Sequence, residues 1–131
     1  YLLAHNVKAL GEIIDIKSVG LHPNYSPLGA LVATRKVIAD HNISPDQIES
    51  IEVNEAFAVK TWAMRKYINI HPERINPLGG ALAYGHPYGA TGGILIAHLM
   101  CALKLGSKPY GIATMGVAGG QGIAVLVKKY E

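Results

Sequence analysis

The sequence predicts a single α/β domain, a mixed five-stranded sheet with helices on both faces. Five segments have the length and apolar pattern of strands, and three longer segments between them carry apolar residues at helical spacing. The chain has 131 residues, half of them hydrophobic, which is enough to bury one ordinary core. We therefore expect one domain over residues 1–131, with the element order β-α-β-α-β-α-β-β.

The first half of the chain is expected to hold two strands and one long helix. Residues 1–9 look like the end of a helix, and since no methionine opens the chain, we expect it to begin inside a larger fold. Residues 12–21 alternate apolar and polar side chains, which predicts a half-buried strand. Residues 30–41 predict an amphipathic helix. Residues 44–47 (SPDQ) predict one capped helical turn before a brief strand over residues 51–53.

The second half is expected to hold two helices and three strands. Residues 54–58 should lie where the strand gives way to a helix that runs to about residue 70, and residues 75–78 predict a further strand. The helix over residues 91–105 is apolar almost all round, so we expect it to be buried on several sides. Residues 110–115 and 122–128 predict two strands whose short connection makes them an antiparallel pair. The first of these helices takes its apolar bulk from Phe57, Trp62, Met64 and Ile68.

Charge and cysteine content exclude several classes of protein. The net charge is +3 and the cationic residues are scattered, so nucleic acid binding is not expected. A mildly basic surface favours phosphate-bearing small molecules such as coenzyme A, although basic domains without such ligands are common. The longest apolar stretch, residues 94–103, is too short to span a membrane. Cys101 is the single cysteine, which fits a reducing compartment such as the cytoplasm, and we expect it to lie in the core.

Three segments have residues that suit chemistry. Asn54 and Glu55 lie where a strand gives way to a helix, and the amide can hold a water or donate to an oxygen; the alternative is a helix cap. His86 lies in a glycine-rich turn before an apolar helix, where it could donate from Nε2 to a thioester oxygen; the alternative is a solvated turn histidine. The glycines of residues 116–122 permit close approach to a ligand or simply form a tight turn. The other histidines have no metal-site spacing, so no metal is expected.

Together, three motifs resemble the C-terminal domain of thiolases, the acetyl-CoA acyltransferases. They are NEAFA at residues 54–58, GGALAYGHPYGATGG at residues 79–93 and GVAGGQGIAV at residues 116–125. The resemblance covers essentially the whole chain. It implies a thiolase fold, in which two similar α/β halves pack as a five-layered αβαβα core. It also implies that the N-terminal half, absent here, carries the nucleophilic cysteine.

The resemblance also implies roles for single residues. Asn54 would position a water, and that water and His86 would form an oxyanion hole for an acyl-CoA thioester, which is the substrate; no separate cofactor is expected. Phe57 would line the pocket. Ala56, Gly85 and Gly119 would contact the substrate. Gly116 departs from the family pattern, because members usually have there a second cysteine that acts as the acid and base.

Two hypotheses follow from this departure. The chain is one half of a thiolase-family acyltransferase, inactive or impaired alone, or it is a degenerate thiolase half that keeps only a coenzyme A pocket or an interaction surface. In either case an isolated half would expose a large apolar face. We therefore expect it to bind an N-terminal half or to self-associate, as a homo-oligomer does.

Overall fold

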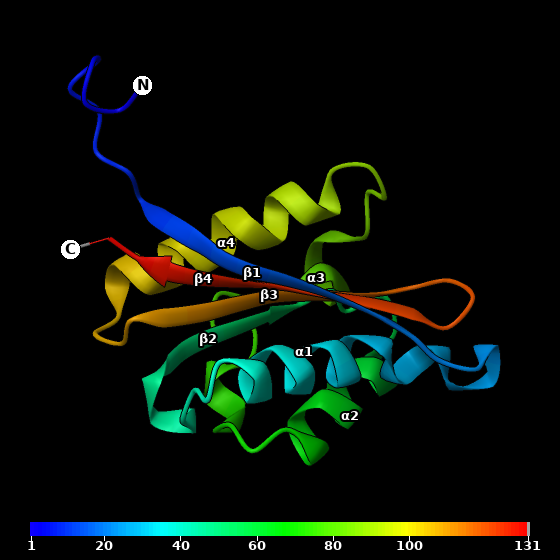
Figure 1. Ribbon diagram of the computed structural model, residues 1–131. Helices are drawn as coiled ribbons and strands as arrows, with labels where there is room; N and C mark the ends of the chain where they lie inside the picture. Colours follow the sequence, from blue (N-terminus) through cyan, green and yellow to red (C-terminus); the bar gives the residue numbers. More distant parts are fainter. Residues whose placement is uncertain (131) are drawn as a thin grey trace.

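The structure, a computed structural model, describes residues 1–130 and has one four-stranded sheet between two layers of helices (Figure 1). The strands are β1 (Gly11–Gly20), β2 (Ile48–Val53), β3 (Tyr110–Val117) and β4 (Gln121–Lys129). The helices are α1 (Gly29–Asp40), α2 (Ala58–Tyr67), α3 (Ala81–Tyr84) and α4 (Thr91–Leu105). Short 3₁₀ turns are η1 (Pro23–Leu28), η2 (Pro45–Gln47) and η3 (Pro72–Arg74).

The sheet is mixed, as predicted, with the order β1-β4-β3-β2. Strand β2 pairs in parallel with β3, while β4 is antiparallel to both β3 and β1. Helices α1 and α2 cover one face and α4 covers the other (Figure 1). The predicted hairpin at the end of the chain is confirmed. Because β2 and β3 are parallel, their carboxyl ends lie side by side at the same end of the sheet, which is called its carboxyl edge below.

The prediction of a fifth strand over residues 75–78 is wrong. Ile75 forms a single bridge with Ile51, and the chain then turns at Asn76, whose φ is 51°. The Asn76 side chain completes the pairing instead: its Oδ1 accepts from the N–H of Val53 at 2.7 Å and its Nδ2 donates to the Val53 carbonyl at 3.0 Å. Pro77 follows and has no N–H to donate. The Asn76 side chain therefore forms the two backbone hydrogen bonds with Val53 that a neighbouring strand would otherwise supply.

The expected helix over residues 1–9 is also absent. These residues form hydrogen-bonded turns that project from the body of the domain (Figure 1). Asn6, with a φ of 50°, interrupts the helical conformation. The side chains of residues 1–8 are exposed, so no tertiary packing offsets the cost of starting a short helix.

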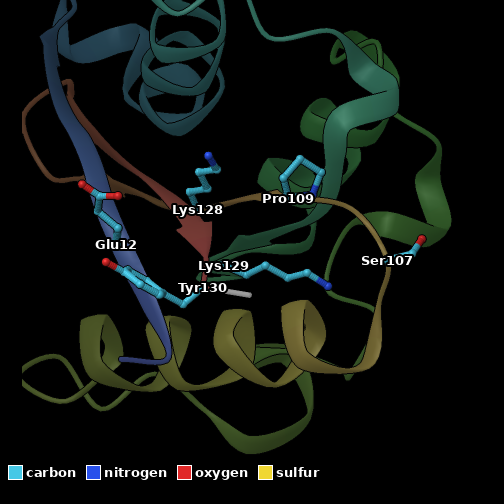
Figure 2. A pocket seen from close by; sticks show the side chains of 6 residues that line it. All are labelled: Glu12, Ser107, Pro109, Lys128, Lys129 and Tyr130. Carbon is cyan, nitrogen blue, oxygen red and sulfur yellow. The ribbon is translucent and has the colours of Figure 1, made fainter. Parts of the chain in front are cut away.

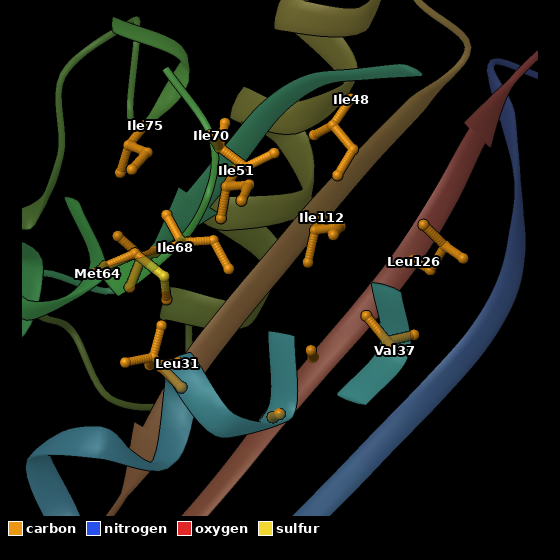
Figure 3. Packing of buried hydrophobic residues seen from close by; sticks show 14 of the residues in the cluster. Leu31, Val37, Ile48, Ile51, Met64, Ile68, Ile70, Ile75, Ile112 and Leu126 are labelled. Carbon is orange, nitrogen blue, oxygen red and sulfur yellow. The ribbon is translucent and has the colours of Figure 1, made fainter. Parts of the chain in front are cut away.

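The main core lies between the sheet and the layer of α1 and α2. Figure 3 shows that helices α1 and α2 and each of the strands β2, β3 and β4 contribute side chains to this core. Leu31 and Val37 of α1 face Ile112 and Leu126 across this layer, and each of the four is at most 5% exposed. A smaller cluster lies under α4; its fully buried members include Leu99 and Leu103. The main core holds α1 and α2 against one face of the sheet, and the smaller cluster holds α4 against the other face.

Helix α4 is buried on one side only, which corrects two expectations. Its buried residues are Thr91, Leu95, Leu99, Ala102 and Leu103. Gly93, Ala97 and Cys101 are exposed on the other side. Cys101 is therefore a surface residue of this domain rather than a core residue. Among residues 1–130, no helix has the length and hydropathy needed to cross a membrane.

Candidate active site

Asn54 lies at the end of β2, directly after its last residue. Its N–H donates to the carbonyl of Thr114 at 3.0 Å, so the pairing of β2 with β3 continues for one more residue. The side chain is 3% exposed. Helix α2 begins only at Ala58, and its N-cap position is Phe57, which makes no side-chain capping bond. The helix-cap alternative for Asn54 is therefore wrong, and so is the prediction that Asn54 and Glu55 lie at the start of the helix.

His86 meets Asn54 across the gap between this strand end and α4. The Asn54 Nδ2 lies 3.1 Å from Nε2 of His86, while the Asn54 Oδ1 is buried and has no hydrogen-bond partner among the described residues. Gly85, with a φ of 91°, directs the chain into the turn that holds the histidine. The imidazole is half-buried and open to solvent on one side. Two of the predicted site residues are thus brought together, with one amide oxygen left for a water or a ligand.

Thr91, at the start of α4, orients the imidazole from the opposite edge. Its Oγ1 lies 2.7 Å from Nδ1 of His86 and donates to the carbonyl of Pro87 at 3.1 Å. The ring of Tyr88 packs edge-on at 4.7 Å between centroids. Because the Thr91 hydroxyl donates to Pro87, its Oγ1 accepts from Nδ1–H of His86, and Nε2 of the neutral ring accepts from the Asn54 Nδ2. Nε2 becomes a donor when the ring carries a proton on both nitrogens. Sequence reasoning missed Thr91, although a hydroxyl five residues after His86 at a helix start was a usable signal.

A buried acidic pair lies next to the site. Glu52, on β2, is 1% exposed, and burial raises the pKa of its carboxyl, against a hydrogen bond from Ser50. Glu55 accepts a hydrogen bond from the N–H of Leu82 at 3.2 Å. A Cβ at Gly80 would overlap the Glu55 carboxylate, which explains a glycine at that position. Glu55 thus ties the strand end to α3, and α3 leads directly to the histidine turn.

Gly116 lies in β3 rather than in the loop, opposite Gly122 of β4. Its φ is not positive, so its backbone does not require glycine. A Cβ built there would lie 3.5 Å from the carbonyl oxygen of Ser26, 3.7 Å from Nζ of Lys60 and 3.8 Å from the backbone nitrogen of Ala30. These are ordinary van der Waals separations. The position therefore has room for a Cβ, and the Lys60 ammonium lies beside it.

The other residues predicted to contact a substrate are Phe57, Ala56 and Gly119, and they make fewer contacts within the domain. Phe57 is 66% exposed, and its ring centroid lies 5.5 Å from Nζ of Lys60. Ala56 follows Glu55 and is half-buried. Gly119 lies at the tip of the hairpin with a φ of 81°, and nothing lies within 4 Å of a Cβ built on it. Its contact with a substrate stays a prediction.

A hollow lies away from this site, at the other end of the sheet. It has a volume of about 560 Å³ and lies between the start of β1 and the end of β4 (Figure 2). Glu12, Lys128 and Tyr130 line it, together with Pro109 before β3. Because β4 is antiparallel to β3, this is the opposite edge of the sheet from Asn54. Within residues 1–130, no three His, Cys, Asp or Glu side chains cluster as metal ligands would.

Comparison with known proteins agrees with the sequence motifs. Residues 7–129 match the family described as "Thiolase, C-terminal domain". The chain is 43% identical over 126 residues to YhfS of Bacillus subtilis (strain 168), provisionally named an acetyl-CoA C-acetyltransferase, covering 94% of this chain and 34% of that protein. It is 35% identical to the acetyl-CoA acetyltransferase of Escherichia coli (strain K12), covering 97% of this chain and 32% of that protein.

Solved structures of thiolases have the same fold as this chain. The crystal structure of human mitochondrial 3-ketoacyl-CoA thiolase in complex with CoA superimposes with a TM-score of 0.92 at 30% identity, covering 99% of this chain and 33% of that one. The Acat5 thiolase from Ascaris suum in complex with coenzyme A gives a TM-score of 0.90 at 29% identity, covering 98% and 33%. The chain thus spans about a third of the length of the proteins it matches.

Proposed function

This chain belongs to the thiolase family, as its C-terminal domain, and we propose that it supplies the oxyanion-stabilising half of an acyltransferase acting on acyl-CoA thioesters. The observation that carries the proposal is the pair formed by Asn54 and His86 at the carboxyl edge of the sheet. The reaction would be acetoacetyl-CoA formation or its reverse, 3-ketoacyl-CoA thiolysis. The nucleophilic cysteine would come from an N-terminal half.

The geometry of the pair supports this role. When carbon–carbon chemistry occurs next to a thioester, negative charge develops on the thioester oxygen, and fixed donors lower the barrier. Nε2 of His86 would be one donor when the ring carries a proton on both nitrogens, with the thioester oxygen taking the place of the Asn54 amide nitrogen beside it. The unpartnered Oδ1 of Asn54 would accept from a water, whose other hydrogen would be the second donor. The start of α4, at Thr91, adds the positive end of a helix dipole near the same oxygen.

The exposed side of α4 is the surface on which the N-terminal half would pack. Gly93, Ala97 and Cys101 recur every fourth residue along this side, which allows another helix to approach closely. Leu105 at the end of the helix is 78% exposed. In the absence of that half, we expect a second copy of this chain to cover the surface. A cytoplasmic location stays a prediction from the single cysteine.

Gly116 favours a second candidate function, a thiolase-like module that binds coenzyme A or a partner without catalysis. Glycine has no proton to exchange, and removal of a general acid or base typically lowers a rate by about 10²–10⁴. The two candidates share the binding step and differ in the chemistry. Binding is therefore the first property to test.

The test is thermal unfolding of this chain with and without millimolar acetyl-CoA. A ligand at 100 times its dissociation constant stabilises the folded state by about 2.7 kcal/mol. We expect an upward shift of Tm that His86→Ala abolishes. The control is His71→Ala, because the His71 side chain is 63% exposed and lies outside the site. A shift that survives His86→Ala would contradict the proposed site.

The absence of any shift in the parent chain would call for the same measurement after assembly with an N-terminal thiolase half that carries the reactive cysteine. We then expect acyl transfer from the assembled protein and its loss with His86→Ala. If the assembled protein neither binds acetyl-CoA nor transfers an acyl group, the enzymatic proposal is wrong, and the interaction module is the better description.

A further inference from the structure

Lys60 places a positive charge at the carboxyl edge of β3, beside the position that Gly116 leaves empty. Its Nζ lies 3.7 Å from a Cβ built on Gly116 and 5.5 Å from the centre of the Phe57 ring. Lys60 lies in the first turn of α2, which starts four residues after Asn54. The ammonium therefore lies between a predicted pocket residue and the missing acid and base.

No partner within the described residues accounts for this orientation. Among residues 1–130, Lys60 takes part in no ion pair and in no side-chain hydrogen bond, and it is half-buried. The Phe57 ring is a weak partner for an ammonium. The backbone nitrogen of Ala30, in the first turn of α1, faces the same position and also favours negative charge there. The nearest atom to this position is the Ser26 carbonyl oxygen, at 3.5 Å, which already accepts a hydrogen bond from the N–H of Gly29. The ammonium is thus the charged group beside this position, which suits a group that exchanges a proton.

We propose that Lys60 replaces the cysteine of the family as the group that exchanges a proton with the reacting carbon. The inference rests on the proposed function, because it requires an acyl-CoA thioester held by His86 and Asn54. Its basis is the position of Nζ, within contact distance of the place where the side chain of residue 116 would begin.

The chemistry balances in both directions. In thiolysis, the cysteine thiolate of the N-terminal half attacks the 3-keto carbon, and the carbon–carbon bond breaks to leave the acyl group on that cysteine and an enolate of acetyl-CoA. The Lys60 ammonium gives a proton to the α-carbon of the enolate. The neutral amine then takes the thiol proton of the incoming coenzyme A, and the thiolate attacks the acyl group on the partner half. In condensation, the coenzyme A thiolate released when the first acetyl group passes to the cysteine takes the Lys60 proton, and the neutral amine then removes the α-proton of the second acetyl-CoA. The resulting carbanion attacks the acetyl group, the carbon–carbon bond forms and the cysteine thiolate leaves.

The first test asks whether Nζ occupies this place, and it needs no ligand. Gly116→Cys is made in a Cys101→Ser background, so that the new thiol is the single cysteine. We expect iodoacetamide alkylation to report a thiol pKa at least about one unit lower with Lys60 present than after Lys60→Met, because a nearby cation stabilises a thiolate. Equal thiol pKa values with and without Lys60 would overturn the inference.

The second test measures proton exchange. Acetyl-CoA is incubated in D₂O with the protein, and deuterium in the acetyl group is followed by mass spectrometry. We expect Lys60→Met to lower the exchange rate at least about 100-fold, with acetyl-CoA binding retained. Lys60→Arg should be as slow, since arginine keeps the charge but does not give up a proton. Gly116→Cys added to Lys60→Met should restore exchange.

The outcomes separate the inference from the proposed function. If acetyl-CoA binds and exchanges its protons equally well after Lys60→Met, the proposed function stands and Lys60 is not the proton-transferring group. If Lys60→Arg exchanges as fast as the parent, the lysine acts through its charge alone, which also contradicts proton transfer. If neither the parent chain nor its assembly with an N-terminal thiolase half binds acetyl-CoA, the proposed function fails and this inference fails with it.

Discussion

The hydroxyl oxygen of Thr91 lies 2.7 Å from Nδ1 of His86 and joins the histidine turn to the first residue of α4. We expect Thr91→Val to weaken acetyl-CoA binding about tenfold, because the ring loses the hydrogen bond that sets its orientation. Thr91→Ser, which keeps the hydroxyl, should bind like the parent. Isothermal titration of the three proteins makes the comparison, and equal affinities would show that packing alone holds the ring.

Asn76 secures the strand end from which Asn54 projects, through two hydrogen bonds to Val53. Asn76→Ala should lower the free energy of unfolding by about 2–4 kcal/mol, since it removes both bonds and puts alanine at a positive φ. Asn42 supplies the control, because its φ is also 50° and its side chain makes no hydrogen bond among the described residues. Asn42→Ala should cost only about 1 kcal/mol in urea unfolding. Similar losses for both variants would mean that the Asn76 bonds contribute little.

The sequence allowed prediction of those features that local patterns encode. The alternation in β1 and the hairpin of β3 and β4 are confirmed, as is the helical spacing in α1. The prediction of a strand over residues 75–78 was wrong. Their apolar pattern suits a strand, but a long-range side-chain contact of Asn76 decides the backbone there, and periodicity does not encode such a contact.

The candidate site was predictable in part. His86 and Asn54 were found from the motifs that resemble thiolases, and the structure adds the contact between them. The position of Lys60 next to Gly116 was not predictable, because the two residues come from different elements and meet only through the packing of α2 against η1 near the end of β3. Cys101 was misjudged because an apolar helix in an isolated domain buries only the side that faces its own sheet.

Glu52 should make stability depend on pH near the acid range. Burial raises the pKa of its carboxyl in the folded state, so the folded protein binds this proton more tightly than the unfolded chain. Its contribution is favourable at low pH and is lost as the pH rises through the folded pKa. Glu52→Gln should therefore stabilise the fold at pH 7 by on the order of 1 kcal/mol and give no gain near pH 4. Urea unfolding at both pH values tests this, with the exposed Glu73→Gln as the control.

Asp15 should show the opposite sign. Hydrogen bonds from His41 and Lys17 lower the pKa of its carboxyl from 3.8 to about 2. Its contribution is present above the unfolded value and is lost as the pH falls toward 2, because the unfolded chain takes up the proton first. Asp15→Asn should remove this part of the acid transition, whereas Asp46→Asn, outside the network, should not. A carboxylate carbon that titrates near 3.8 by NMR would contradict the assignment.

The exposed side of α4 should make the isolated chain self-associate. Ala97 lies at the middle of this side, between Gly93 and Cys101, and helices that present small residues can pack closely. We expect dimers or larger species in sedimentation at micromolar concentration. Ala97→Glu should shift the protein toward monomer, because a carboxylate would have to be buried in the contact. Ala39→Glu, on the exposed side of α1, is the matched control and should leave association unchanged. A parent chain that sediments as a monomer at these concentrations would mean that this surface does not pair with itself, and titration with an N-terminal thiolase half would then test whether it pairs only with its own counterpart.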